Sequence, residues 1–366
     1  MKTGTIAVIG GYGQVGRVIC KRLMMHHSNK VIAAGRSFKK AKAFSEEVEN
    51  KVVPQLIDVM SNDQYPDWLK EVDICVMCIE QKHPNFIKFC FQHHIHYIDI
   101  SPSYESLSQV MVFDELAKKS QSSAVIGVGL SPGLSNLLAS QLSNEMDQVE
   151  QIDTYLMLGI GEVHGHDGVN WLLNHIQKNY TLMENGLEKQ VKPFSDGKRS
   201  AFHHSIGKRT AYRFNLADQY ILQQTADVTK TSSRFFYDSK LATIGVVVAK
   251  KLGLSYLLRV AVIKRAYRMF LSLSLKLFEK LRIGTDLYTV KVEVSGEKQG
   301  KGVQYEASIT GNNNTKITGE VAAVVVDYLQ SGKKQAGVHY LEQMMELDEI
   351  LFLLDERANV TYMNHS

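Results

Sequence analysis

The chain has 366 residues, of which 44% are hydrophobic and 22% charged, and this length and composition suggest a globular protein of two domains. A net charge of +4 is too small to indicate binding to nucleic acid. The 4 cysteines fit a reducing compartment, and no apolar run is long enough to span a membrane. No apolar leader precedes Ile6, so we expect a cytoplasmic protein.

The first 36 residues follow the order strand, glycine-rich loop, helix, strand. The apolar run 6–9 predicts a buried strand, and the loop after it contains G-x-G-x-x-G as Gly11, Gly13 and Gly16. A helical pattern with one apolar face follows, and the apolar run 30–34 closes the unit. This order within about 30 residues is the context that a dinucleotide-binding fingerprint requires.

Each glycine of the loop has a physical role in such a site. The first permits a tight turn, the second lets a pyrophosphate approach the backbone, and the third lets the helix pack on the strand. The helix N-terminus adds free N–H groups and a partial positive charge. The alternative is a structural turn that binds no ligand. We predict a dinucleotide site whose first part is Gly11, Tyr12, Gly13, Gln14, Val15 and Gly16.

The end of the second strand indicates which dinucleotide binds. An NAD site usually places an acidic residue there to bond the ribose hydroxyls. No acidic residue lies between residues 30 and 44, where the chain instead carries Arg36, Ser37 and Lys40. Because an arginine and a hydroxyl can bind a 2′-phosphate, we predict NADP rather than NAD. The alternative is that these residues are the solvated start of a helix.

The chain to about residue 128 alternates between predicted strands and helices. Strands are expected at 52–57, 73–79, 96–100 and 124–128, and helices at 39–48, 85–93 and 113–119. This alternation predicts an α/β domain, a doubly wound parallel Rossmann sheet, with its ligand outside the carboxyl ends of the strands. That edge supplies further cofactor-binding candidates, which are Asp58, Val59, Cys78, Ile79 and Ser101. Cys75 and Cys78 spell C-x-x-C, but residues three apart on a strand point to opposite faces, so we predict no metal site.

A second domain is predicted beyond residue 130. The loop 129–136 opens a helix, and strand-like runs follow at 152–160, 211–214, 287–294 and 304–310, with a hairpin loop expected at 296–302. These runs predict an α+β domain built on a mainly antiparallel sheet. We place the Rossmann domain at 1–130 and a substrate or dimerisation domain at 131–315. A buried helix is expected at 320–329 and a last helix at 341–354.

Four motifs occur together in the first 140 residues, at 9–16, at 34–37 with 40–41, at 97–101 and at 129–134, and weaker matches follow at 206–209 and 337–338. With them the chain resembles the saccharopine dehydrogenase-like NAD(P)-binding oxidoreductases. The resemblance implies a Rossmann domain, an inserted substrate domain, and C-terminal helices at about 316–366 that return to the first domain. It also implies NAD(P)-linked reduction of an imine formed from an amine and a keto acid, or the reverse oxidation.

Two residues are candidates for acid–base catalysis. Asp99 stands at the end of a predicted strand, where it could protonate an amine or orient a water; alternatively, it caps the turn at 101–103. His166 lies in the sequence His-Gly-His-Asp, and an imidazole there could be the general acid or base; alternatively, this is a surface turn. Imine reduction requires such a proton source.

Three arginines of the second domain are candidates for binding substrate carboxylates, because a guanidinium group is a planar fork that matches a carboxylate. They are Arg209, Arg213 and Arg234. The alternative is that each is a structural arginine at the surface. The family resemblance implies that the substrate is an amino-acid-derived, opine-like small molecule, whose carboxylates these arginines would bind.

The stretch 252–282 is apolar and basic, with Glu279 as its only acidic residue. Such a helix can form a dimer or domain interface, which is the interpretation that we favour, or can lie on an anionic membrane. The sequence therefore predicts a homodimeric NADP(H)-dependent oxidoreductase acting on a C–N bond. The alternatives are a membrane-associated reductase of a lipid-like substrate and a non-catalytic NADP(H)-binding sensor.

Overall fold

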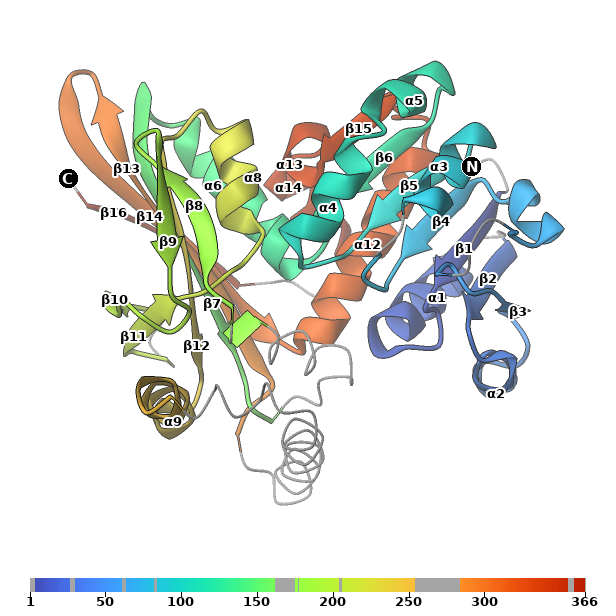
Figure 1. Ribbon diagram of the computed structural model, residues 1–366, viewed down its shortest axis with the longest axis horizontal. Coiled ribbons are helices and arrows are strands. Elements are labelled where there is room, and N and C mark those ends of the chain that lie inside the picture. Colours follow the sequence, from blue (N-terminus) through green and yellow to red (C-terminus); the bar gives the residue numbers. More distant parts are fainter. Residues whose placement is uncertain are drawn as a thin grey trace. The chain divides into compact units, whose positions relative to one another are not determined.

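The computed structural model describes residues 4–26, 30–60, 64–81, 84–161, 175–176, 178–203, 206–253, 284–354 and 359–365. The chain forms two compact units (Figure 1), the first from Met1–Leu134 with Thr315–Arg357 and the second from Ser135–Asn314 with Ala358–Ser366. The candidate His166 lies outside the described residues, as does the stretch 252–282 beyond residue 253. No helix in the described part of the chain is long and apolar enough to cross a membrane.

The first unit contains a seven-stranded sheet in the order β15-β6-β5-β4-β1-β2-β3, in which every neighbouring pair is parallel. Its strands are β1 (Thr5–Ile9), β2 (Lys30–Gly35), β3 (Val53–Leu56), β4 (Ile74–Met77), β5 (His96–Asp99), β6 (Ser123–Ile126) and β15 (Gly337–Tyr340). The strand order reverses between β1 and β4, which is where doubly wound sheets bind their ligands. The predicted Rossmann sheet is confirmed.

Helices flank both faces of this sheet (Figure 1). They are α1 (Gln14–His26), α2 (Phe38–Glu47), α3 (Asn85–Gln92), α4 (Tyr104–Met111), α5 (Asp114–Lys119), α12 (Asn314–Gln330), α13 (Leu341–Met344) and α14 (Leu347–Leu353), with the short turns η1 (Asp67–Glu71) and η2 (Leu130–Leu134). Because helices cover both faces, the central strands are apolar throughout: residues 6–9 of β1 are all buried.

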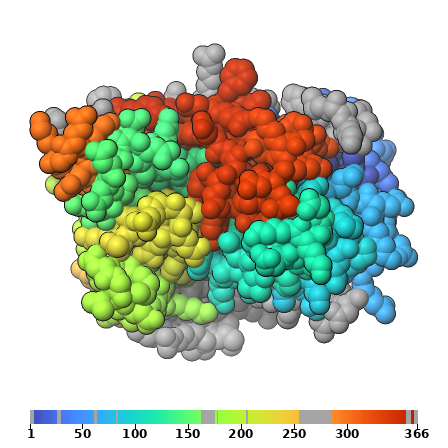
Figure 2. Space-filling model, turned by 90° about the horizontal axis from the view of Figure 1, so that it is seen from above, coloured from blue at the N-terminus to red at the C-terminus, as the bar shows by residue number. Residues whose placement is uncertain are grey.

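The C-terminal part of the first unit completes the sheet and covers it. The Val338 N–H donates to Asp114 Oδ1 at 2.8 Å, and Figure 2 shows the C-terminal segment beside α4 and α5. A Cβ atom added at Gly319 of α12 would lie 2.7 Å from Val18, so α12 packs closely on α1. The single helix expected at 341–354 is wrong, because extended backbone at Met345 and Glu346 separates α13 from α14.

The second unit contains another seven-stranded sheet, in the order β10-β11-β12-β7-β13-β14-β16. All neighbouring pairs are antiparallel except β12 and β7, which confirms the predicted mainly antiparallel sheet. Its strands are β7 (Gln148–Leu158), β10 (Lys198–Ala201), β11 (Lys208–Arg213), β12 (Lys230–Tyr237), β13 (Leu287–Lys298), β14 (Lys301–Asn312) and β16 (Asn359–His365). A separate hairpin pairs β8 (Tyr180–Glu184) with β9 (Leu187–Val191).

The helices of the second unit are α6 (Ser135–Ser143), α8 (Asp218–Thr225) and α9 (Lys240–Lys251) within the described ranges. Helix α8 lies on one face of the sheet, since Thr231 Oγ1 donates to Gln219 O at 2.8 Å. Thr231 pairs with Ile152, and Ser232 pairs with Asp153 one residue later. Because side chains alternate along a strand, Asp153 lies on the opposite face of the sheet.

Two expectations for this unit are wrong in detail. The hairpin loop is not 296–302 but only Gln299 and Gly300, both with positive φ (54° and 70°), a two-residue turn whose twist suits paired strands. Helices were expected through 366, but residues 359–365 form strand β16 beside β14. The segment contains valine, threonine and tyrosine, which favour strands, and β14 offers it a free edge.

Candidate functional site

The glycine loop follows β1 at the carboxyl edge of the first sheet, where it is held by the neighbouring strand. The Gly10 N–H donates to Ala34 O at 2.8 Å. A Cβ atom added at Gly11 would lie 2.8 Å from Ala33 Cα, and one at Gly16 would overlap Gly10 O and lie 2.7 Å from Gly11 Cα. Both positions therefore require glycine for steric reasons, as the fingerprint predicts.

Gly13 differs from the other two glycines because it is exposed. An added Cβ atom there would meet only Gly10 O, at 3.0 Å, within 4 Å. Helix α1 begins at the next residue and has no acidic residue in its first turn. The loop thus presents open backbone and a helix N-terminus, an arrangement that suits a pyrophosphate.

Tyr12 connects the glycine loop to the end of β2. Its hydroxyl oxygen accepts a hydrogen bond from the Ser37 N–H at 3.0 Å. A Cβ atom added at Gly35 would lie 2.7 Å from the same hydroxyl, so the tyrosine ring packs directly on the Gly35 backbone. Sequence reasoning placed Tyr12 in the cofactor loop but missed this contact, for which the glycine at 35 was the available signal.

The predicted 2′-phosphate ligands lie just beyond this contact. Ser37 is the N-cap of α2, with a long contact of 3.4 Å from the Lys40 N–H to Ser37 Oγ. Arg36 and Lys40 are exposed, and no ion pair within the described ranges engages either side chain. Both cations are therefore available to an anionic ligand, while the Ser37 hydroxyl also serves the helix.

The other cofactor candidates differ in how close they lie to the glycine loop. Cys78 and Ile79 are adjacent to it, since a Cβ atom added at Gly10 would lie 3.4 Å and 3.0 Å from their side chains. Asp58 is exposed at the end of β3 and accepts from the Met60 N–H at 3.0 Å, whereas Val59 is buried. The buried Ser101 has a 3.4 Å contact from the Ser103 N–H to its Oγ. The cofactor roles of all five candidates stay predictions.

Asp99 is completely buried, at 0% exposure. Its Oδ1 accepts from the Ser101 N–H at 2.7 Å and its Oδ2 from the Tyr97 hydroxyl at 3.0 Å. Burial raises the pKa of this carboxyl to about 7, against the opposing effect of the two hydrogen bonds. The geometry favours the alternative in which Asp99 fixes the turn after β5, and a catalytic role stays a prediction.

The three candidate substrate arginines lie on the neighbouring strands β11 and β12. Arg213 and Arg234 are register partners and both are buried. Arg213 forms an ion pair with Glu184 at 2.8 Å, and Arg234 one with Asp196 at 2.9 Å. Arg209 is half-buried. Because protein carboxylates already engage the paired arginines, these two contribute to the packing of the second unit, and their role toward a substrate stays a prediction.

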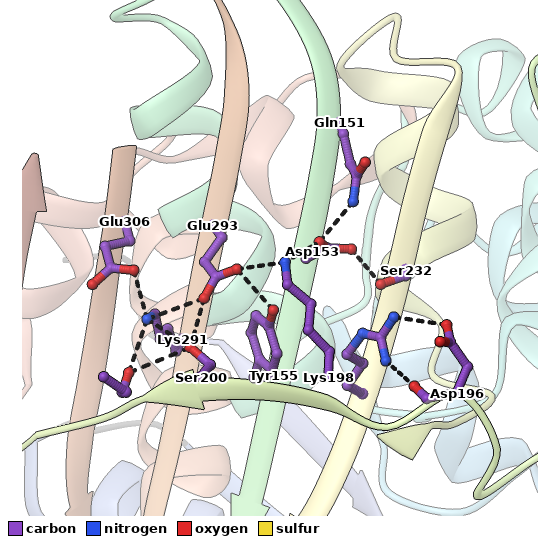
Figure 3. Close-up of polar contacts among 12 residues, drawn as sticks. Gln151, Asp153, Tyr155, Asp196, Lys198, Ser200, Ser232, Lys291, Glu293 and Glu306 are labelled. Atoms are coloured by element: carbon purple, nitrogen blue, oxygen red, sulfur yellow. Dashed lines mark hydrogen bonds and ion pairs between the residues drawn. The ribbon is translucent and has the colours of Figure 1, made fainter. Parts of the chain in front are cut away.

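A buried charged cluster, which was not predicted from the sequence, lies on the face of the second sheet opposite α8, and Figure 3 shows its polar contacts. Lys291 is buried, with its Nζ 2.6 Å from Glu306 Oε2 and 3.1 Å from Glu293 Oε1. The same Nζ donates to Ser200 Oγ at 3.0 Å and to Ala201 O at 2.9 Å. We call this set, together with Lys198, Tyr155 and Asp153, the charged cluster.

Strand β10 crosses the face of the sheet in Figure 3 and brings two of these side chains over it. Lys198 Nζ lies 2.8 Å from both Glu293 Oε2 and Asp153 Oδ2. Tyr155 donates to Glu293 Oε2 at 2.7 Å. Burial by itself would raise the pKa of Glu293, but hydrogen bonds from Lys198, Ser200 and Tyr155 lower it to about 2. Glu293 is therefore held in its charged form.

Comparisons with known proteins give a family for the first unit and a fold for the whole chain. Residues 6–125 match the family described as the saccharopine dehydrogenase NADP binding domain. No curated protein matches the chain. Among solved structures, apo saccharopine dehydrogenase (L-Glu forming) from Saccharomyces cerevisiae has a TM-score of 0.67 and 13% identity, over 99% of this chain and 100% of that one.

Two further structures have TM-scores below 0.5 and support no argument. An engineered D-amino acid dehydrogenase bound to NADP+ has a TM-score of 0.49 and 12% identity, with 97% of each chain covered. The DAP dehydrogenase of C. glutamicum in complex with DAP has a TM-score of 0.47 and 11% identity, also with 97% of each chain covered. At these identities the likeness concerns the fold alone.

Proposed function

Since residues 6–125 match the saccharopine dehydrogenase NADP binding domain family, we propose that the protein is an NADP(H)-dependent oxidoreductase that acts on a C–N bond. The proposed substrate is amino-acid-derived and opine-like, and the reaction is imine reduction or secondary-amine oxidation. A cytoplasmic location and a homodimer are part of the same proposal. The observation that carries it is the open glycine loop with the Arg36 guanidinium at the end of β2.

The choice of NADP rests on charge at that strand end. The exposed Arg36 and Lys40 offer two cations to a 2′-phosphate, and Tyr12 orders the backbone between them and the glycine loop. The sequence has no acidic residue from 30 to 44 that would repel the phosphate. An exposed carboxylate, that of Asp58, follows β3, which is the strand that pairs with β2.

The choice of a C–N bond rests on the family match and on the fold. Over 99% of this chain, the fold is similar to that of saccharopine dehydrogenase (L-Glu forming) from Saccharomyces cerevisiae. Within the described ranges, no three His, Cys, Asp or Glu side chains gather as metal ligands would. The bound nicotinamide would supply the hydride, while residues of this chain would bind the substrate and deliver the proton.

The cofactor proposal predicts that Arg36→Ala removes the preference for NADPH over NADH. Loss of a charge-assisted contact to the 2′-phosphate should weaken NADPH binding by about 1.5–3 kcal/mol, or about tenfold to over a hundredfold, and leave NADH binding unchanged. Fluorescence titration of wild type and variant with each nucleotide measures both. Lys42→Ala is the matched control, since Lys42 lies on α2 in a surface ion pair with Glu46. If Arg36→Ala and Lys42→Ala lost the same NADPH affinity, the assignment of Arg36 to the 2′-phosphate would be contradicted.

The reaction proposal predicts that NADPH is oxidised only when an amine and a keto acid are supplied together. An imine forms from the two substrates, so neither alone should support turnover. Loss of reduced nicotinamide absorbance in a screen of amino acid and keto acid pairs is the measurement, with each compound alone as control. Tight NADPH binding without turnover for any pair would favour the sensor function instead.

A further inference from the structure

Helix α9 presents a row of exposed aliphatic side chains. Leu241, Ile244, Val248 and Leu252 are 83%, 52%, 46% and 70% exposed. Their spacing of three, four and four residues places them along one side of the helix and its C-cap. Exposed apolar residues are ordinary when they are scattered, but a contiguous row of four indicates a surface that binds something. We call this row the α9 stripe.

The helix does not need the α9 stripe to stay folded. Its buried side carries Thr243 and Val247. Thr243 Oγ1 accepts from the Tyr237 N–H at 3.0 Å, which ties the helix to β12, and Ser239 Oγ caps the first turn by accepting from the Ala242 N–H at 3.2 Å. Substitutions in the stripe should therefore leave the fold of the unit intact.

The charged residues of helix α9 itself are all lysines. Lys240 and Lys251, at its two ends, are both exposed. Lys250 is the third lysine of the helix, which has no acidic residue, and Asp238 just before it accepts hydrogen bonds from the Ser239 and Thr285 N–H groups at 2.7 and 2.9 Å. Lysine side chains can extend past apolar neighbours to reach anionic groups, which suits the boundary between lipid headgroups and acyl chains.

The same charges argue against a second copy of this chain as the occupant. A two-fold symmetric contact through α9 would place Lys240 of each copy near Lys251 of the other, and like charges at close range repel. An anionic surface instead neutralises them. We propose that the α9 stripe docks the protein on an anionic phospholipid surface, with the aliphatic row entering the headgroup boundary. This peripheral contact is separate from the proposed reaction.

The test is co-sedimentation of the full chain with phosphatidylcholine vesicles, with and without phosphatidylserine, at low and high salt. Wild type should bind vesicles that contain phosphatidylserine at low salt, and at least tenfold more weakly without that lipid or at high salt. Leu241→Glu should weaken this binding at least tenfold. Leu187→Glu is the matched control, because Leu187 is a 73% exposed leucine on β9 of the same unit.

Three results would overturn the proposal. If the wild-type protein does not bind phosphatidylserine vesicles at low salt, an anionic membrane is excluded as the partner. Full binding by Leu241→Glu, with an unchanged circular dichroism spectrum, moves the contact to another surface. Sedimentation showing a dimer that Leu241→Glu dissociates, without vesicle binding, assigns the α9 stripe to an interface between copies.

Discussion

Lys291→Met is expected to lower the free energy of unfolding by about 3–5 kcal/mol. The substitution keeps the length of the side chain but removes the cation that pairs with Glu293 and Glu306 inside the second unit. Two buried carboxylates would then lie close together without their shared partner, which costs far more than losing a surface ion pair. Urea unfolding followed by circular dichroism measures the difference from wild type.

Lys298→Met is the matched control for this prediction. Lys298 lies on the same strand and also forms an ion pair, with Glu145 at 3.3 Å, but both partners are substantially exposed. Ion pairs at the surface contribute little to stability, so this variant should be nearly as stable as wild type. If both variants unfold at the same urea concentration as wild type, the charged cluster does not hold the sheet together.

The decrease in the free energy of unfolding that Lys291→Met causes should depend on pH. The folded-state pKa of Glu293 lies near 2, below its ordinary 4.5, so the stability that this carboxylate contributes is present above pH 4.5 and is lost as the pH falls toward 2. In the variant, Glu293 keeps its partners Lys198, Ser200 and Tyr155, but the cation between Glu293 and Glu306 is gone, so protonation at low pH removes the repulsion between these two carboxylates. The difference in the free energy of unfolding between variant and wild type should therefore become smaller as the pH falls below 4.5.

Gly16→Ala is expected to abolish measurable NADPH binding. The added Cβ atom would overlap Gly10 O and lie 2.7 Å from Gly11 Cα, and both are backbone atoms that cannot move aside as a flexible side chain would. Helix α1 must then shift away from the loop, which displaces the N–H groups that would bind the pyrophosphate. We expect a loss of at least a hundredfold in NADPH affinity by fluorescence titration, together with lower thermal stability.

Two further glycine substitutions separate ligand binding from folding. Gly13→Ala adds a Cβ atom whose nearest neighbour is Gly10 O at 3.0 Å, so the fold should change little while the methyl group obstructs the pyrophosphate. Gly245→Ala in α9 is the control, because nothing lies within 4 Å of its added Cβ and alanine favours a helix. NADPH affinity of wild-type strength in Gly16→Ala would show that the glycine loop is not the binding site.

The fold class and the position of the glycine loop could both be predicted from the order of residues along the chain. A Rossmann half is encoded by neighbouring residues: the apolar run of β1, the glycines that follow and the apolar face of α1 lie within about 30 residues. The steric requirement for glycine at 11 and 16 could be stated from the motif alone. The position of Arg36 at the end of β2 could likewise be predicted, because this arginine directly follows an apolar run in the sequence.

Which polar groups are buried could not be predicted from the sequence, because burial depends on segments that are far apart along the chain. On β13, Lys291 and Glu293 alternate with valines, a pattern typical of a strand with one solvated face, yet strand β10 crosses that face and buries both. The same holds for Arg213, whose partner Glu184 comes from the β8–β9 hairpin. Periodicity shows which side chains share a face, but the segment that covers the face comes from elsewhere in the chain, so burial and partners follow only from the fold.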